Sequence, residues 1–462
     1  MRESDGQSIR PFLASLDREG ALLRIDKAVD PRFEMSAFLS SADAGPALMF
    51  DRIEGFDLRA AGNLLNGRER IAAALGIGTA DILRRLDAAI SNPVKTVAAV
   101  ETPVQACVTT ENPLASLPVP RFFEREERHY VTAGAIVARD PASGRGNLSF
   151  ARLAILDGRS AMIGIAPNHH LALFARRAAE AGRELEIGVV VGAHPAIQIA
   201  ACLYLGVGDD ELECAGHLLG EPVRVARALT VDLSVPAEAE WVLEGRIDAR
   251  RTIEEGLVSE YHGMYENYGR GYLATFSAVT RRSDAIFQVI EPGYHREHMY
   301  LAALPIAAGL LRAARAAVPN VLDVAVTEAG AGRTDVVVQV ASPRPGQPRR
   351  VMFAVFAAVS IVKRVTVVDE DIDPRDATAV EWARTNRMRL ERDLLLMPNS
   401  GADRSEPMEA GGLVTKAGFD ATAKEGDRAE GNERALPPRA VAESVKRWLT
   451  DRLPAERRRW LK

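Results

Sequence analysis

The stretch that predicts a β-rich centre for this chain is Gly146-Asn147-Leu148-Ser149-Phe150-Ala151-Arg152-Leu153-Ala154-Ile155-Leu156. Its second half is apolar and compatible with a β-strand, and Gly144 and Gly146 indicate a turn before it. Side chains alternate between the two faces of a strand, so one face would present Asn147, Ser149 and Ala151 and the other Leu148, Phe150 and Arg152.

Two later segments carry polar groups of the kind that bind hard metal ions. The residues from Ile163 to Pro167 predict a second short strand with a polar tip, Asn168-His169-His170, and an acidic cluster follows at 209–213. The amide of Asn147, the imidazole of His169 and the carboxylate of Glu211 form a mixed oxygen and nitrogen set that suits Mn²⁺ or Mg²⁺. A surface acidic loop and a core histidine with satisfied hydrogen bonds would explain the same residues.

Two glutamates five positions apart, Glu255 and Glu260, lie in the segment 254–263. Taken alone, such a pair is most often a solvated edge, because carboxylates are mostly surface residues. In an apolar pocket, however, desolvation favours the neutral form of a glutamate, which would make Glu260 a suitable proton donor near neutral pH. Arg152 stays charged and would pair with Glu255 or grip a substrate carboxylate. A purely structural ion pair that fixes the strand is the alternative for Arg152.

In order and spacing, these motifs resemble those of the UbiD family of reversible decarboxylases. The motifs are Asn147-x4-Arg152, Pro167-x-His169, Glu211 five residues before Gly216, Val235-Pro236 followed by Glu240-x2-Leu243-Glu244-Gly245, Glu255-x4-Glu260, and Lys363 followed by 367–373. The resemblance extends from Ile9 to the basic C-terminus. One departure is visible, because many members carry Glu-Gly-Pro-x-Gly-Glu where this chain has Leu257 and Ser259 in place of the proline and the second glycine.

The resemblance implies prenylated FMN as cofactor, together with a divalent metal and often K⁺. Loss of CO₂ from an unsaturated or aromatic acid leaves a carbanion that no side chain can delocalise, so a cofactor must take that role. The family pattern assigns metal binding to Asn147, His169 and Glu211, cofactor contacts to Phe150, Ala151, Arg152, Asn168 and Lys363, and catalysis to Arg152, Glu255 and Glu260. A flavin prenyltransferase would supply the cofactor.

The implied activity is the reversible, non-oxidative decarboxylation of an aromatic, heteroaromatic or α,β-unsaturated carboxylic acid, with release of CO₂. The stretches 166–170, 262–265 and 287–298 look most like the furandicarboxylate branch, which favours a furan-2,5-dicarboxylate-like substrate. A second substrate carboxylate needs a cation or a histidine, and the candidates are His295, Arg296, His298 and Arg333; a polar loop beside the cofactor explains each equally well. Alternatives are an inactive flavin- or metal-binding accessory subunit and an FMN oxidoreductase on the same barrel.

Composition agrees with an ordinary enzyme. The chain has 462 residues, 47% of them hydrophobic, and a net charge of −5, which argues against a nucleic-acid partner. Three cysteines without paired spacing predict a reducing compartment. No apolar signal core opens the chain, and no segment reaches the roughly 18 uninterrupted apolar residues of a membrane span. We therefore expect a cytoplasmic homo-oligomer, a dimer or hexamer, with no membrane partner.

The predicted fold class is α/β (α+β) with three domains: an N-terminal α/β domain at 1–105, a split β-barrel that binds prenylated FMN at 106–300, and a C-terminal α/β oligomerisation domain at 301–462 with a terminal arm and helix. The barrel is implied by the family, which relates it to flavin reductases. Expected helices are 9–19, 68–75, 80–89, 171–181, 301–318 and 440–461. Expected strands include 47–50, 321–327, 335–340, 352–356 and 364–368, and 401–438 is expected to be an extended arm.

Overall fold

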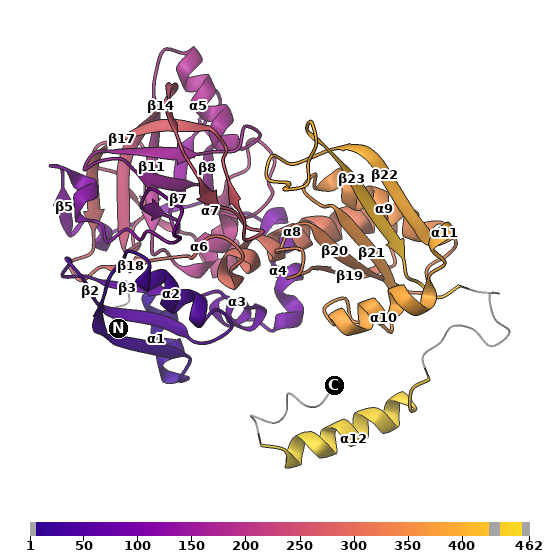
Figure 1. The fold of residues 1–462 in the computed structure, drawn as a ribbon. Coiled ribbons are helices and arrows are strands. Elements are labelled where there is room, and N and C mark those ends of the chain that lie inside the picture. Colours follow the sequence, from indigo (N-terminus) through magenta and orange to yellow (C-terminus); the bar gives the residue numbers. More distant parts are fainter. Residues whose placement is uncertain (1–5, 425–434, 455–462) are drawn as a thin grey trace.

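The computed structural model describes residues 6–424 and 435–454 and has a mixed α/β fold in three parts (Figure 1). The N-terminal part is a four-stranded sheet in the order β1-β2-β3-β18, in which β18 comes from far along the chain. Its strands are β1 (Leu22–Val29), β2 (Ala47–Ile53), β3 (Arg59–Gly62) and β18 (Ile286–Gln288). Its helices are α1 (Arg10–Arg18), α2 (Glu34–Ser41), α3 (Arg68–Ala74) and α4 (Ile82–Ser91).

The central part is a nine-stranded sheet that curls into a half-barrel (Figure 1). Its order is β6-β9-β10-β17-β14-β11-β7-β8, and β5 pairs with β17. The strands are β5 (Cys107–Thr109), β6 (Tyr130–Val131), β7 (Ala135–Arg139), β8 (Gly146–Phe150), β9 (Arg152–Ile155), β10 (Ser160–Gly164), β11 (Leu185–Val191), β14 (Trp241–Glu254) and β17 (Arg270–Arg281). Helices α5 (His170–Glu180), α6 (Pro195–Ala200) and α7 (Glu211–Leu219) belong to this part.

Two small sheets complete the centre. One joins β13, β12 and β4, and the other is the hairpin of β15 and β16. Their bounds are β4 (Val97–Ala98), β12 (Arg224–Arg227), β13 (Ser234–Pro236), β15 (Val258–Ser259) and β16 (Tyr265–Glu266). The β15–β16 hairpin holds Glu260 directly after its first strand, so the altered 255–260 loop still forms a defined turn.

The C-terminal part is a five-stranded sheet in the order β19-β20-β21-β23-β22. Its strands are β19 (Val321–Val326), β20 (Asp335–Val340), β21 (Arg364–Asp369), β22 (Leu394–Gly401) and β23 (Leu413–Asp420). The helices are α8 (Arg296–Ala317), α9 (Gln347–Ala358), α10 (Ala377–Arg387), α11 (Leu390–Asp393) and α12 (Arg439–Arg452). Helix α12 lies apart from the body of the molecule in Figure 1.

The predicted α/β class and most predicted elements are confirmed, but two strand predictions in the centre were wrong in extent. The single strand expected at 146–156 is two strands, separated at Ala151. Strand β8 pairs with β7, whereas β9 pairs with β10 and β6. The strand expected to end at Pro167 ends at Gly164. The His169 N–H donates to the Ala166 carbonyl, which forms a turn, and His169 precedes helix α5.

Three further predictions need correction. Residues 352–356 are helical, within α9, because a short apolar run cannot distinguish helix from strand and Pro348 occupies the first turn of a helix here. The segment expected as an extended arm contains β23, which pairs with both β21 and β22, while 425–434 lies outside the described residues. Helices α6 and α7 interrupt the centre in addition to the expected helix α5.

Helix α8 is long and apolar enough to cross a membrane by length and composition alone, and it contains Pro305 without ending there. However, 61% of its most apolar window is buried inside the body, as expected for a core helix. The helix expected at 301–318 is confirmed, and it begins earlier, at Arg296.

Two glycines, Gly245 in β14 and Gly309 in α8, allow a matched test of how tightly the backbone is packed at each position. A Cβ atom added at Gly245 would lie 2.5 Å from the Thr275 carbonyl oxygen across the β14–β17 pairing, whereas one added at Gly309 in α8 would meet nothing within 4 Å. We expect Gly245→Ala to destabilise the protein by about 2 kcal/mol through overpacking. Gly309→Ala should be neutral or stabilise by up to about 1 kcal/mol through helix propensity. Thermal unfolding monitored by circular dichroism measures both, and equal shifts would contradict the packing at Gly245.

Candidate active site

A buried ion pair joins two strands of the central sheet. Arg152 opens β9, and Glu255 directly follows β14. The guanidinium donates twice to the carboxylate, from Nε to Oε1 at 2.6 Å and from Nη2 to Oε2 at 2.7 Å. Burial alone would lower the pKa of Arg152, but the bond to Glu255 outweighs it and raises this pKa further above its ordinary value. Arg152 therefore stays charged in a site largely closed to water, with the Glu255 carboxyl as its hydrogen-bond partner.

Glu260 lies beside this pair and is held by two hydrogen bonds. Its Oε1 accepts from the Tyr261 N–H at 2.8 Å, and its Oε2 accepts from the Tyr268 hydroxyl at 2.5 Å. Burial would raise the pKa of Glu260, but the charge of Arg152 and the two donors outweigh it and hold this pKa below its ordinary value. The expectation that desolvation keeps Glu260 neutral was therefore wrong for the resting site, because the neighbouring cation and donors decide the balance.

Two of the three expected metal ligands are in contact. Asn147 and Glu211 are buried, and the Asn147 Nδ2 lies 3.1 Å and 3.2 Å from the two carboxylate oxygens. The Leu148 N–H also donates to Glu211 at 2.7 Å. Burial raises the pKa of Glu211 to about 8, because its hydrogen-bond donors are neutral. The third candidate, His169, is exposed just before α5.

In the part of the chain that the structure describes, no three or more histidine, cysteine, aspartate or glutamate side chains gather as a metal cluster. The expected set contains only two such residues, with the Asn147 amide as its third member. Of the other expected cofactor contacts, Phe150 and Ala151 are half-buried against the core, and Asn168 is exposed.

Three consecutive residues of the C-terminal part, which the sequence analysis did not single out, contact Tyr268, Tyr261 and Lys363. The Arg404 guanidinium lies 4.3 Å from the centre of the Tyr268 ring. The Ser405 carbonyl accepts from the Tyr261 hydroxyl at 3.5 Å, and Glu406 forms a 2.6 Å ion pair with Lys363. Lys363, the expected cofactor contact, is thus engaged by Glu406. We name residues 404–406 the bridging loop; they lie between β22 and β23.

Tyr268 is the second feature that sequence reasoning missed. Two guanidiniums contact its ring, with Arg152 at 5.1 Å and Arg404 at 4.3 Å from the ring centre. The only sequence signal for it was a tyrosine eight positions after Glu260 within a polar segment, which is common at protein surfaces.

The four candidate substrate residues divide into two pairs. His298 Nε2 lies 3.0 Å from Arg333 Nη2, and its Nδ1 lies 3.0 Å from the Gly293 carbonyl. Burial, followed by the charge of Arg333, lowers the pKa of His298 to about 4, so this imidazole is neutral. Arg333 also contributes to the lowered pKa of Glu260, which places its charge within electrostatic reach of that carboxylate.

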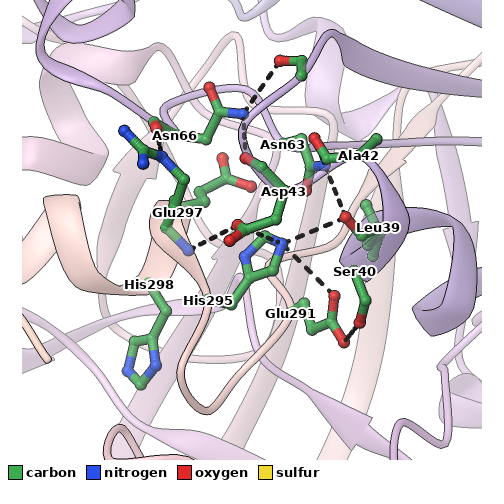
Figure 2. Close-up of polar contacts among 12 residues, drawn as sticks. Leu39, Ser40, Ala42, Asp43, Asn63, Asn66, Glu291, His295, Glu297 and His298 are labelled. Atoms are coloured by element: carbon green, nitrogen blue, oxygen red, sulfur yellow. Dashed lines mark hydrogen bonds and ion pairs between the residues drawn. The ribbon is translucent and has the colours of Figure 1, made fainter. Parts of the chain in front are cut away.

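The His295 side chain and the Arg296 backbone N–H instead contact Asp43 of the N-terminal part. Figure 2 shows His295 and His298 pointing in different directions, with His295 directed toward the α2 region. The His295 Nε2 lies 3.1 Å from Asp43 and 3.5 Å from Glu291, whereas the Arg296 side chain pairs with Glu328 at 2.9 Å. A cavity of about 280 Å³ lies between this cluster and the β15–β16 hairpin, lined in part by Asp43, Glu291, His295 and Ser259.

Comparison with protein-family models shows to which family this chain belongs. Three models for 3-octaprenyl-4-hydroxybenzoate carboxy-lyase match the chain: the N-terminal domain at 13–90, the Rift-related domain at 95–295 and the C-terminal domain at 299–421. The chain belongs to the UbiD family. It is therefore a UbiD-type carboxy-lyase, as the sequence motifs predicted.

Three relatives each match 90% or more of this UbiD-family chain. Anhydromevalonate phosphate decarboxylase of Methanothermobacter thermautotrophicus is 30% identical, over 90% of this chain and 96% of that protein. The UbiD-class enzyme HmfF from Pelotomaculum thermopropionicum, solved with FMN, is 36% identical, with a TM-score of 0.90 over 93% of this chain and 97% of that one. The apo 3,4-dihydroxybenzoic acid decarboxylase from Enterobacter cloacae is 26% identical, with a TM-score of 0.87 over 95% and 99% of the two chains.

Neighbouring glutamates of this UbiD-family protein test the buried pair. Glu255→Gln leaves the Arg152 charge buried without its counter-charge, so we expect a loss of about 3 kcal/mol in stability. Glu254 is exposed and pairs with the exposed Arg270 at 3.3 Å, so Glu254→Gln should change stability by less than about 0.5 kcal/mol. Chemical denaturation of both variants checks the contrast. Equal effects would show that burial does not govern the Arg152–Glu255 pair.

Proposed function

We propose that this carboxy-lyase removes CO₂ reversibly from an aromatic, heteroaromatic or α,β-unsaturated acid with prenylated FMN as cofactor. The observation that carries the proposal is the convergence of Arg152 with Glu255 and Glu260, two glutamates from a segment about 100 residues later, in one largely buried site. Arg152 is the common partner, because it binds Glu255 directly and its charge acts on Glu260.

The residues near β8 fit the phosphate end of such a cofactor with a divalent ion, Mn²⁺ or Mg²⁺. Glu211 is a buried carboxylate whose neighbours supply only neutral donors, so a bound cation would supply the missing positive charge. Asn147 and the exposed His169 would complete the ligand set, and Phe150, Ala151 and Asn168 would contact the flavin. We include K⁺ in this proposal as a second ion that the family often binds. When bound, the prenylated flavin supplies the electron sink for the carbanion left by CO₂ loss.

Arg152 and Glu260 would have separate tasks. The Arg152 guanidinium is fixed by Glu255 and points a permanent charge into the site, where it orients the departing carboxylate. Glu260 would deliver the proton that replaces CO₂ on the product carbon. Since Glu260 is ionised in the resting site, it must first gain that proton after its surroundings change.

The Arg333–His298 pair supports a substrate with a second anionic group. Arg333 provides a permanent charge near Glu260, and the neutral His298 can donate or accept a hydrogen bond. A furan-2,5-dicarboxylate-like acid is the favoured substrate, because the stretches 166–170, 262–265 and 287–298 resemble the furandicarboxylate branch of the family. The likeness to anhydromevalonate phosphate decarboxylase makes an unsaturated acid with a phosphate the second candidate. His295 and Arg296 are already engaged by Asp43 and Glu328, so they fit a second carboxylate less well.

The proposed function implies two kinds of protein partner, a supplier of the cofactor and other copies of this chain. A flavin prenyltransferase would supply the cofactor in the cytoplasm. The chain would also form a homo-oligomer, and an evolved form of HmfF is described as dimeric. Helix α12 carries exposed Val441, Val445 and Trp448 on one side, an apolar stripe suited to cover by another copy of the chain.

The experiment that tests the function is co-expression with a flavin prenyltransferase, followed by mass spectrometry of the bound cofactor and a screen of acids for CO₂ release. Furan-2,5-dicarboxylate and furan-2-carboxylate should be compared, because only the first offers a second carboxylate to Arg333. Activity on neither of these nor on unsaturated or aromatic acids would favour an accessory subunit. Nicotinamide-dependent dye reduction would instead identify an FMN oxidoreductase.

Metal binding has its own test. Glu211→Gln should lower the retained Mn²⁺ and prenylated FMN by at least about tenfold while the fold is kept, because the amide has no charge to offer the ion. Glu213→Gln, on the same helix and paired with Arg145 at 3.5 Å, is the control and should retain both. Metal analysis and cofactor absorbance measure the outcome. Full cofactor content in Glu211→Gln would refute the ligand assignment.

Proton delivery is tested by Glu260→Gln. The amide keeps the shape but cannot release a proton at neutral pH, so turnover should fall at least about 100-fold while the cofactor is retained. Glu266→Gln, in the same hairpin and 3.4 Å from His262, is the control and should stay within a few-fold of wild type, by the usual size of surface substitutions. Solvent-deuterium incorporation into product is the second measurement. Near-normal turnover and labelling in Glu260→Gln would place the donor elsewhere, with His262 or His295 next to test.

A further inference from the structure

The tyrosine that holds Glu260 is fixed in place from several sides. The Asn267 side chain accepts a hydrogen bond from the Gly269 N–H at 2.9 Å, and Gly269 has a φ of +77°, so the chain turns sharply around Tyr268. The Gly269 carbonyl accepts from the Glu255 N–H at 2.8 Å. The segment 267–269 therefore fixes the backbone of one site glutamate and the side chain of the other.

The ring of Tyr268 is also restrained. Arg152 covers it on the barrel side and Arg404 of the bridging loop contacts it as well, at 5.1 Å and 4.3 Å from the ring centre. Cation–π contacts of this kind favour a defined ring position. With the ring held, the hydroxyl at 2.5 Å from Glu260 Oε2 has a short hydrogen bond to a charged acceptor, which is the stronger class of hydrogen bond.

We propose that Tyr268 is a positioning residue whose hydroxyl holds the Glu260 side chain turned toward the β17 side of the site until substrate enters. The proposal rests on the proposed role of Glu260 as proton donor. It adds a specific gate to that role, because Glu260 must leave the Tyr268 hydroxyl before it can hold a proton for the product carbon.

The other charged groups around Glu260 do not replace this contact. Arg152 from β9 and Arg333 from the loop before β20 both favour the carboxylate form through their charge. Glu255 is occupied by Arg152, and His298 of α8 is neutral. The Tyr261 N–H binds the other oxygen, Oε1. Tyr268 is therefore the group that binds Oε2, and its own proton is held firmly, because burial and the Glu260 charge raise the pKa of Tyr268.

The test compares Tyr268→Phe with wild type, each with and without Glu260→Gln. In each background, the infrared difference between the chain with Glu260 and the chain with Glu260→Gln isolates the protonation of this one carboxyl. Loss of a hydrogen bond to a charged acceptor should make Glu260 about a tenfold weaker acid, so its titration midpoint should rise by about one pH unit. Incorporation of 3-fluorotyrosine at 268, a stronger donor of similar size, should restore a midpoint at or below that of wild type.

The matched control is Tyr265→Phe. Tyr265 lies in the same hairpin, its hydroxyl accepts from the Arg125 N–H at 3.3 Å, and its ring is contacted by the Arg125 guanidinium. Its loss should leave the Glu260 midpoint unchanged. An unchanged midpoint in Tyr268→Phe, or an equal shift in Tyr265→Phe, would overturn the proposal.

A kinetic measurement separates this proposal from the proposed function. With any acid accepted in the substrate screen, Tyr268→Phe should move upward, by the same amount, the pH limb of kcat/KM that reports Glu260 in the free enzyme, since the hydroxyl binds Glu260 before substrate enters. If Glu260→Gln stays active while the infrared shift occurs, the proton-donor role fails but the Tyr268 contact is established. If Glu260→Gln is inactive and no shift occurs, the donor role stands and the Tyr268 proposal fails.

Discussion

The buried pair of Arg152 and Glu255 is the interaction on which the site depends. It ties the start of β9 to the end of β14, and neither charge can be withdrawn without leaving the other uncompensated in a place with little water. Gly164, paired with Arg152 across β10, makes room for it, since a Cβ there would lie 3.1 Å from the guanidinium. The strand pairing, the small residue opposite and the loop after β14 are thus all constrained by one ion pair.

Charge balance in the resting site has a direct consequence for catalysis. Two carboxylates, Glu255 and Glu260, face two guanidiniums, Arg152 and Arg333, while His298 is neutral. A substrate anion that enters adds a negative charge and would pair with the same guanidiniums, Arg152 and Arg333. By the ordinary effect of a nearby like charge, this raises the pKa of Glu260 and favours uptake of a proton when one is needed. The substrate itself would then help to convert the ionised resting glutamate into an acid.

Sequence reasoning identified the family, the fold class and the three residues of the central network, because widely spaced motifs in a fixed order are specific even when each motif is weak. It was wrong where short-range signals are ambiguous, as at 352–356, where an apolar run is helical, and at Ala151, where the predicted strand breaks. It also assigned a raised pKa to Glu260 from burial alone. The opposing contacts come from Arg152 and Tyr268, and the Arg404 contact that holds Tyr268 comes from a segment expected to be an arm. Such long-range contacts leave no periodic pattern in the chain.

The bridging loop offers a route to changing this enzyme without altering its barrel. Arg404, Ser405 and Glu406 are adjacent in sequence yet contact Tyr268, Tyr261 and Lys363, which come from separate segments. A random library of only three codons would therefore vary three properties together: the pKa of Glu260, the position of the β15–β16 hairpin and the pairing of Lys363. Loops also tolerate substitution better than sheet interiors. For directed evolution, a library of these three positions is small, yet its variants would change contacts to Tyr268, Tyr261 and Lys363.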